Sequence, residues 1–151
     1  VGIGAVKYAD LSSDLIRDYV FDLDRMVAFE GDTGPYLQYA HARICSILRR
    51  AGEDPSSTPF PVKEPAERAL ALILLRWNQV VQSAANRLEP HLLAHYLREV
   101  AEAFNGFYQS CPVIKADDEE LKRSRVRLCG LTGRVLADGL HLLGIEAPEC
   151  M

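Results

Sequence analysis

The 151-residue sequence contains no uninterrupted apolar run of the roughly 18 residues that a membrane-spanning helix requires, so we expect no segment to cross a membrane. It also lacks an excess of positive charge, because 17 Lys and Arg residues are outnumbered by 21 Asp and Glu residues, and the net charge is −4. A generic nucleic-acid-binding domain is usually basic, so any such contact here must use a local basic face. Arginine supplies 13 of the basic residues, and arginine is well suited to bidentate contact with phosphate.

Cysteine is sparse and has no metal-binding spacing. The 4 cysteines, Cys45, Cys111, Cys129 and Cys150, are far apart, and no Cys-X-X-Cys motif is present. The spacing therefore indicates neither a zinc ribbon nor a redox pair, and it favours reduced thiols in a cytoplasmic protein. No signal-peptide pattern opens the sequence, and because the first residue is Val1 we interpret the chain as part of a longer protein.

What the sequence does contain is the composition and periodicity of a helical domain. Hydrophobic residues make up 48% and charged residues 25%, which is typical of a folded globular protein and excludes disorder. Four stretches carry helical periodicity and none carries the sustained alternation of a strand. They are Pro35–Ala51, Glu64–Leu88, Pro90–Ser110 and Asp117–Leu143. The predicted fold is an all-α antiparallel helix bundle.

Two of these stretches carry specific packing expectations. In Glu64–Leu88, an apolar stripe that includes Trp77 predicts one continuous helix with a mostly buried tryptophan. In Asp117–Leu143, apolar residues recur every seven positions and predict a bundle seam of Leu121, Leu128, Val135 and Leu142. Ile145, just beyond that helix, is expected to pack back on the bundle, and Pro148 to stiffen the exit of the chain.

The first thirty residues are less regular. Tyr8–Tyr19 has helical character, whereas Val20–Phe29 is compatible with either a short strand or an extended connector. Glu53–Lys63 contains three prolines and two serines and is predicted to be a loop. We interpret residues 1–30 as a junction with upstream sequence and residues 31–151 as the helical domain.

The sequence contains pieces of catalytic motifs but no complete one. Asp32–Gly34 matches the aspartic-protease tripeptide, yet Pro35 and a helix follow where that chemistry needs a tight loop between strands. His91 and His95 have a spacing that can bind a metal, without the adjacent glutamate of a zinc protease or a nearby third ligand. Gly2–Gly4 resembles the start of a dinucleotide loop but lacks its third glycine. We therefore predict no catalytic residue and no metal site.

One predicted helix face carries residue types that recognise unpaired bases. At about 100° per residue, Tyr36, Tyr39 and Arg43 lie within roughly 60° of one another. Two aromatic rings beside a guanidinium can bind bases by stacking and by cation contact. From spacing alone the tyrosines can equally be half-buried packing residues, so both interpretations stay open.

A second arginine face is predicted on the last helix. Arg123, Arg127 and Arg134 share one side of Asp117–Leu143, opposite Leu121. Leu128 is expected on the same side as Leu121, opposite the three arginines. The face is either a solvated surface or a phosphate-contacting one.

Three segments carry a family resemblance. Gly4–Ser12, Tyr19–Asp22 and Gly31–Arg43, in that order and spacing, resemble arginyl-tRNA synthetase. The stretch from Leu128 to the terminal Met151 is similar to the end of that family. The resemblance extends over essentially the whole sequence.

The resemblance implies a fold and a function. The family is a class I aminoacyl-tRNA ligase with a Rossmann-type catalytic domain, and its C-terminal DALR-type helix bundle binds the tRNA anticodon stem and loop. By this resemblance the chain is that bundle with its junction, acting as a monomer on tRNA(Arg). ATP and arginine would bind the catalytic domain, and no HIGH-like segment occurs here. We therefore expect no cofactor and no catalysis by this chain alone.

The resemblance also assigns individual residues. Tyr36, Tyr39 and Arg43 fall in the family's tRNA-contacting helix, and Tyr108 falls near an aromatic position that contacts the anticodon loop. Met151 falls at the terminal residue, which reaches the loop in some members. Arg123 and Arg127 complete the predicted tRNA-binding set from the second arginine face. Cys150 departs from the pattern, because many members have a basic residue there.

Two hypotheses follow from the sequence. The first is a tRNA-binding module of a ligase, and the second is a helical protein-interaction domain without an RNA role. Salt-dependent tRNA affinity distinguishes them, because phosphate contacts release counterions.

Overall fold

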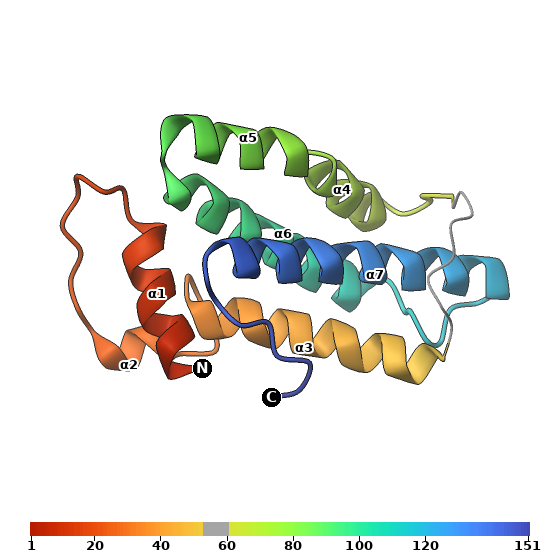
Figure 1. Cartoon of the computed structure of the whole chain (residues 1–151). Helices are drawn as coiled ribbons and strands as arrows, with labels where there is room; N and C mark the ends of the chain where they lie inside the picture. The colour runs from red at the N-terminus through yellow and green to blue at the C-terminus, as the bar shows by residue number, and fades with distance from the viewer. Residues whose placement is uncertain (53–60) are drawn as a thin grey trace.

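The computed structural model describes residues 1–52 and 61–151, which form helices and, within those ranges, no strand. The helices are α1 (Gly2–Ser12), α2 (Leu23–Met26), α3 (Gly34–Ala51), α4 (Pro65–Leu74), α5 (Trp77–Arg87), α6 (Pro90–Ser110) and α7 (Glu119–Leu142). Helix α3 runs in one direction, α4 and α5 return, α6 runs alongside α3, and α7 returns again (Figure 1). The predicted all-α antiparallel bundle is confirmed. None of the helices in these ranges is long and apolar enough to cross a bilayer.

Helix α6 lies at the centre of the bundle and contacts α1, α3, α4, α5 and α7. Its buried residues recur at spacings of three and four, as a helix surrounded by others requires. They are Leu93, Ala94, Tyr96, Leu97, Val100, Ala101, Phe104 and Phe107. The helical periodicity predicted for Pro90–Ser110 is therefore confirmed.

Helix α3 ends at the predicted Ala51 and begins at Gly34, one residue before the predicted Pro35. The hydroxyl of Thr33 accepts a hydrogen bond from the Tyr36 N–H at 3.2 Å and donates one to the Ala28 carbonyl at 2.6 Å. Pro35 occupies the first turn. Gly52 ends the helix with a φ of 64°, a left-handed conformation that favours glycine. These caps fix the start and the direction of the helix that carries the two tyrosines and Arg43.

The prediction of one continuous helix over Glu64–Leu88 is wrong, because α4 ends at Leu74 and α5 begins at Trp77. The buried Tyr96 of α6 reaches this break, where its hydroxyl donates to the carbonyls of Ile73 at 3.0 Å and Leu74 at 3.5 Å. A tertiary contact thus satisfies carbonyls at a helix end. Trp77 packs against the core with its ring 6.2 Å from the Tyr96 ring, and only a minor part of its surface is exposed, so the prediction of a mostly buried tryptophan is confirmed.

The seven-residue seam on α7 is correct only in its first half. Leu121 and Leu128 are buried and Val135 is half-buried, but Leu142 is 56% exposed. A straight α-helix has about 3.6 residues per turn, so positions seven apart drift by about 20° per repeat and rotate toward solvent. Near the end of the helix the buried position is Leu140 instead.

The N-terminal expectations need correction as well. The first helix covers Gly2–Ser12 rather than the predicted Tyr8–Tyr19. The ambiguous stretch Val20–Phe29 contains the short helix α2. Of the predicted loop Glu53–Lys63, residues 53–60 lie outside the described part of the chain.

Helix α1 packs closely on the bundle. A Cβ on Gly34 would lie 2.6 Å from the carbonyl oxygen of Gly4, so only glycine allows α1 and α3 to approach this closely. The buried Tyr8 donates hydrogen bonds to Asp32 at 2.6 Å and to the Ala94 carbonyl at 3.3 Å. Asp32, the acidic residue of the protease-like tripeptide, therefore anchors a tyrosine and helps to fix α1 in place.

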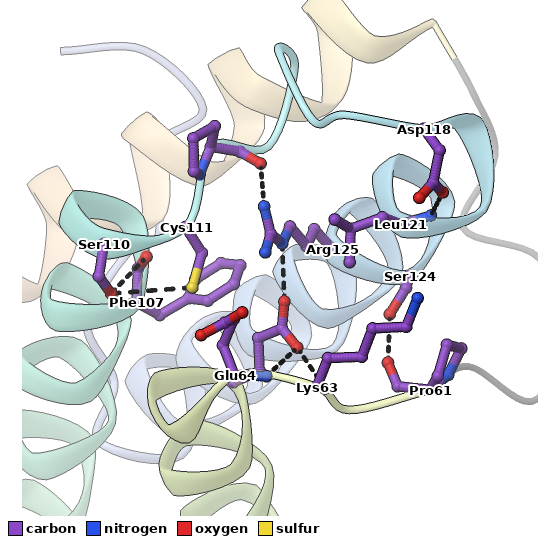
Figure 2. A network of polar contacts seen from close by, with 12 residues as sticks. Pro61, Lys63, Glu64, Phe107, Ser110, Cys111, Asp118, Leu121, Ser124 and Arg125 are labelled. Atoms are coloured by element: carbon purple, nitrogen blue, oxygen red, sulfur yellow. Dashed lines mark hydrogen bonds and ion pairs between the residues drawn. The ribbon is translucent and has the colours of Figure 1, made fainter.

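A buried ion pair closes the end of the bundle where α4 begins. The Arg125 Nε of α7 donates to Glu67 of α4 at 2.7 Å, and its Nη1 donates to the Pro112 carbonyl at 2.7 Å (Figure 2). The other carboxylate oxygen of Glu67 accepts from the backbone N–H of Lys63 at 2.8 Å and of Glu64 at 3.1 Å. Burial raises the pKa of Glu67, but these hydrogen bonds outweigh it and the net pKa is lowered. We call this set the Arg125–Glu67 clamp.

Candidate nucleic-acid interface

Tyr39 and Arg43 form the centre of a cluster on α3 and α6. Arg43 Nη2 donates to the Tyr39 hydroxyl at 2.9 Å, and its guanidinium carbon lies 4.8 Å from the Tyr39 ring centroid. The same guanidinium is 5.6 Å from the ring of Tyr108 on α6. Phe29 packs edge-on against Tyr39 with ring centroids 6.3 Å apart. One cation is thus shared between two aromatic rings from two helices.

Tyr36 has a more structural position in the same cluster. Its hydroxyl accepts a hydrogen bond from Asn105 Nδ2 at 2.7 Å, and Asn105 Oδ1 lies 3.5 Å from Arg43 Nη1. Burial raises the pKa of Tyr36, which is half-buried. Asn105 therefore joins α3 to α6 and helps to fix the orientation of the Arg43 side chain.

The two outer tyrosines keep part of their surface open. Tyr39 is 39% exposed and Tyr108 is 37% exposed. The Tyr108 ring stacks on the buried Phe104 with centroids 6.0 Å apart and an interplanar angle of 26°. A core aromatic thus supports one side of Tyr108. An aromatic surface held in this way loses little side-chain entropy when a base stacks on it.

We call Phe29, Tyr36, Tyr39, Arg43, Asn105 and Tyr108 the aromatic–arginine cluster. The prediction that Tyr36, Tyr39 and Arg43 share a face is confirmed, and the structure adds Tyr108 to them. Asn105 and Phe29 were not predicted. Asn105 precedes Tyr108 by three residues, a spacing that places it on the same side of α6 and was available in the sequence. Phe29 lies in a connector without periodicity, where no sequence signal exists.

Arg123, Arg127 and Arg134 lie on α7, whereas the aromatic–arginine cluster is built mainly on α3 and α6. Arg123 and Arg134 are exposed and Arg127 is half-buried. Arg134 lines a hollow of about 410 Å³ together with Leu128, so the prediction that these two side chains lie on opposite sides of α7 is wrong.

The C-terminal tail, residues 145–151, lies along α3. Ile145 is 3% exposed and its N–H donates to the Leu140 carbonyl at 2.8 Å, which confirms that it packs back on the bundle. Gln38 Nε2 donates to the Glu146 carbonyl at 2.7 Å. His41 contacts the carbonyl of Pro148, and Arg49 contacts the carbonyl of Glu149. Met151 is 48% exposed at the end of this ordered segment.

Helix α3 therefore carries two separate rows of side chains, one in the aromatic–arginine cluster and one against the tail. At about 100° per residue, the row of Tyr36, Tyr39 and Arg43 is separated by roughly 150° from the row that holds the tail. Four of the seven predicted tRNA-binding residues are together in the aromatic–arginine cluster. The other three, Arg123, Arg127 and Met151, lie outside that cluster on α7 and on the tail.

The histidine pair forms an edge-on ring contact. The rings of His91 and His95 are 5.7 Å apart. In the ranges 1–52 and 61–151, no three His, Cys, Asp or Glu side chains are grouped so that they could hold a metal ion.

Comparison with known proteins assigns the class of domain. Residues 37–151 match the family described as the DALR anticodon binding domain, and this match covers more than half of the chain. The chain belongs to the DALR anticodon-binding domain family.

Its relatives carry a more specific name. Arginine–tRNA ligase of Thermobifida fusca is 55% identical over 153 residues, which is 100% of this chain and 27% of that protein. Arginine–tRNA ligase of Frankia casuarinae is 55% identical over 99% of this chain and 26% of that protein. The chain thus spans about a quarter of the length of the curated relatives it matches.

Solved structures agree with the sequence comparison. Thermus thermophilus arginyl-tRNA synthetase matches 99% of this chain with a TM-score of 0.92 and 42% identity, over 26% of its own length. Arginyl-tRNA synthetase of Plasmodium falciparum matches 99% of this chain with a TM-score of 0.88 and 30% identity.

Proposed function

We propose that this chain is the tRNA anticodon-binding part of an arginine–tRNA ligase. In this proposal it holds tRNA(Arg) by the anticodon stem and loop while a catalytic domain in the rest of the protein attaches arginine with ATP. The single observation that supports it most is the Tyr39–Arg43–Tyr108 arrangement, two partly open rings around one guanidinium in a DALR-family domain. ATP and arginine have no role at the residues of this chain.

Each residue of the proposed interface has a distinct task. Tyr39 and Tyr108 stack on unpaired bases of the anticodon loop, and Arg43 contributes its charge between them. Tyr36 and Asn105 orient the arginine rather than contact RNA. Arg123 and Arg127 contact backbone phosphates from α7, and Met151 lies against a base at the end of the tail.

The N-terminal residues supply the proposed contact with the rest of the protein. Large apolar side chains are exposed in this part of the chain, among them Ile3 at 76%, Leu15 at 70%, Ile16 at 90%, Val20 at 87% and Phe21 at 63%. Exposed apolar patches mark interaction sites. We assign residues 1–30 to the junction with the catalytic domain and residues 31–151 to the RNA-binding unit, in a monomeric cytoplasmic ligase.

The alternative function is a helical protein-interaction domain. The observation that favours it is the hollow of about 410 Å³ beside the break between α4 and α5, lined by Leu74, Leu75, Trp77 and Leu131 among others. That hollow is apolar, unlike the aromatic–arginine cluster, so the two functions predict different ligands.

Titration of tRNA at two salt concentrations tests the proposal. We expect the affinity to fall as salt rises, because each phosphate contact releases counterions. Arg43→Ala should weaken binding, and it should also flatten the salt dependence if Arg43 contacts phosphate; contact with a base leaves the slope nearly constant. Arg87→Ala is the matched control, since Arg87 lies on α5 and pairs with Glu89. Equal tRNA affinity for the unchanged chain and Arg43→Ala, or no tRNA binding at all, would contradict the proposal.

A further inference from the structure

The C-terminal tail crosses a cysteine of α3. His41 Nδ1 is 2.9 Å from the Pro148 carbonyl, and both terminal nitrogens of Arg49 lie 3.3 Å from the Glu149 carbonyl. Arg49 Nη2 is also 3.6 Å from the Cys150 sulfur. Cys45 lies on the same helix face midway between these two contacts, about 6 Å of helix rise from each. The tail thus passes along the face of α3 that carries Cys45, and it brings a second thiol, Cys150, to that face.

His41 connects Cys45 to the tail. A carbonyl oxygen only accepts hydrogen bonds, so His41 Nδ1 carries the proton donated to Pro148, and Nε2 is left as an acceptor. The Cys45 sulfur lies 3.7 Å from that Nε2 and 3.9 Å from Nδ1, so the thiol is beside the edge of the ring that joins the two nitrogens. A base beside a thiol, with its ring oriented by a third group, is the arrangement that prepares a thiol to react.

The two thiols differ in exposure. Cys150 is exposed and Cys45 is half-buried, whereas Cys111 and Cys129 are buried. Burial, together with the nearby negative charge of Glu149, raises the pKa of Cys45. Cys150 is therefore the thiol that a dissolved oxidant meets first, and Cys45 is positioned to resolve the product.

We propose that Cys45 and Cys150 form a redox pair, which a peroxide converts to an intrachain disulfide that fastens the C-terminal tail to α3. Hydrogen peroxide transfers an oxygen atom to the Cys150 thiol, which gives a sulfenic acid and one water. His41 Nε2 then takes the Cys45 proton, the Cys45 sulfur attacks the Cys150 sulfur, and the S–O bond breaks. The hydroxide released takes the proton from His41 and leaves as water. In total, two thiols and one peroxide give one disulfide and two waters.

Bond formation requires the end of the tail to bring the Cys150 sulfur to Cys45. A disulfide needs Cα atoms about 4.4–6.8 Å apart, with the two side chains directed toward each other. The contacts of Gln38 and His41 hold the tail up to Pro148, so only the last residues need to shift.

Mass spectrometry of the full 151-residue chain tests the pair. The chain is treated with hydrogen peroxide, the remaining thiols are alkylated under denaturing conditions, and the protein is digested. We expect a linked Cys45–Cys150 peptide pair that dithiothreitol separates, with Cys111 and Cys129 recovered fully alkylated. Cys45→Ser should instead accumulate sulfinic or sulfonic acid at Cys150, and Cys150→Ser should leave Cys45 as a free thiol. An alkylatable Cys45 in wild-type chains whose Cys150 has been consumed, or Cys150 linked mainly between two chains, would overturn the proposal.

The consequence for RNA rests on the proposed function, and a separate measurement reads it. A fastened tail restricts Met151, so we expect the oxidised chain to bind tRNA more weakly and dithiothreitol to restore the affinity. If the disulfide forms and tRNA affinity is unchanged, the redox pair stands and the role of the tail in RNA binding fails. If neither form binds tRNA, the proposed function fails while the linked peptides still support the pair.

Discussion

Two arginines in this small bundle occupy opposite environments. Arg125 lies in the Arg125–Glu67 clamp with its side chain 7% exposed, and the side chain of its partner is 2% exposed. Arg43 lies in the aromatic–arginine cluster, half-buried, with contacts to a hydroxyl, an amide and two ring faces. The first arginine is held by a full negative charge and the second has no carboxylate among these contacts.

This difference separates folding from binding. Taking two charges out of water is expensive, so a buried pair tolerates the loss of neither partner. A cation over an exposed ring contributes only about 0.5–1 kcal/mol. The Arg43 guanidinium therefore remains available for a ligand with negative charge or π-electron density. Arginine type alone does not distinguish the two roles; the accessibility and the partner do.

The largest expected effect comes from breaking the clamp. Arg125→Ala leaves Glu67 buried without its cation, and we expect the free energy of unfolding to fall by about 3–5 kcal/mol. Arg43→Ala should change it by less than about 1 kcal/mol. Urea denaturation at neutral pH measures both. A loss of similar size in the two variants would mean that the contrast between the arginines is wrong.

Acid should weaken the clamp next. The pKa of Glu67 is lowered in the folded chain, so its contribution to stability is complete above the ordinary carboxyl pKa of about 4.3. It is lost as the pH falls through the lower folded value. We expect urea midpoints to drop more steeply below about pH 4.3 for the wild type than for Glu67→Gln, which has no proton to bind at this position. Parallel pH profiles would remove Glu67 from the acid response.

Whether the sequence predicts a contact of either arginine depends on how far apart its partners are along the chain. The ends of α3 follow from Thr33 and Gly52, because caps act over one turn, and the predicted range Pro35–Ala51 matches the helix to within one residue. The shared face of Tyr39 and Arg43 follows from the period of one helix and was also predicted. The pairing of Arg125 with Glu67 spans 58 positions, and no local pattern contains it.

The errors have the same origin. Continuous periodicity over Glu64–Leu88 does not reveal that Tyr96 reaches the carbonyls at a break from a different helix. The repeat ending in Leu142 follows a seven-residue period that a straight helix does not keep. Patterns within single helices therefore predict the bundle and the α3 part of the aromatic–arginine cluster. Contacts between helices determine the break between α4 and α5, the Arg125–Glu67 clamp and the orientation of Arg43.

Removing one ring should affect RNA more than the fold. Tyr39→Ala deletes a side chain that is 39% exposed, and base stacking on an aromatic contributes about 1–3 kcal/mol per base. We expect tRNA affinity to fall by an amount in that range with a smaller change in the free energy of unfolding. Tyr19→Ala is the control, because Tyr19 is a similarly exposed tyrosine that bonds Asp10 away from the cluster. A loss of several kcal/mol in stability with unchanged affinity of the folded fraction would make Tyr39 a packing residue.

The smallest expected change in stability concerns the tail. Deleting Cys150 and Met151 removes the contact of Arg49 Nη2 with the Cys150 sulfur but keeps the Arg49 contact with the Glu149 carbonyl. The anchors at Ile145 and Pro148 also remain, so the thermal stability should change by no more than about 0.5 kcal/mol.

The same deletion should still weaken tRNA binding, because Met151 is 48% exposed at the end of a segment that α3 holds in one direction. A frayed terminus would need no such anchoring and would show equal affinity with and without its last two residues. Met151→Ala in the 151-residue chain is the sharper variant, since it keeps the backbone of the tail in place and removes only the thioether side chain. Weaker binding by both variants at one salt concentration assigns the contact to the methionine side chain. Weaker binding by the deletion alone assigns it to the backbone or to Cys150.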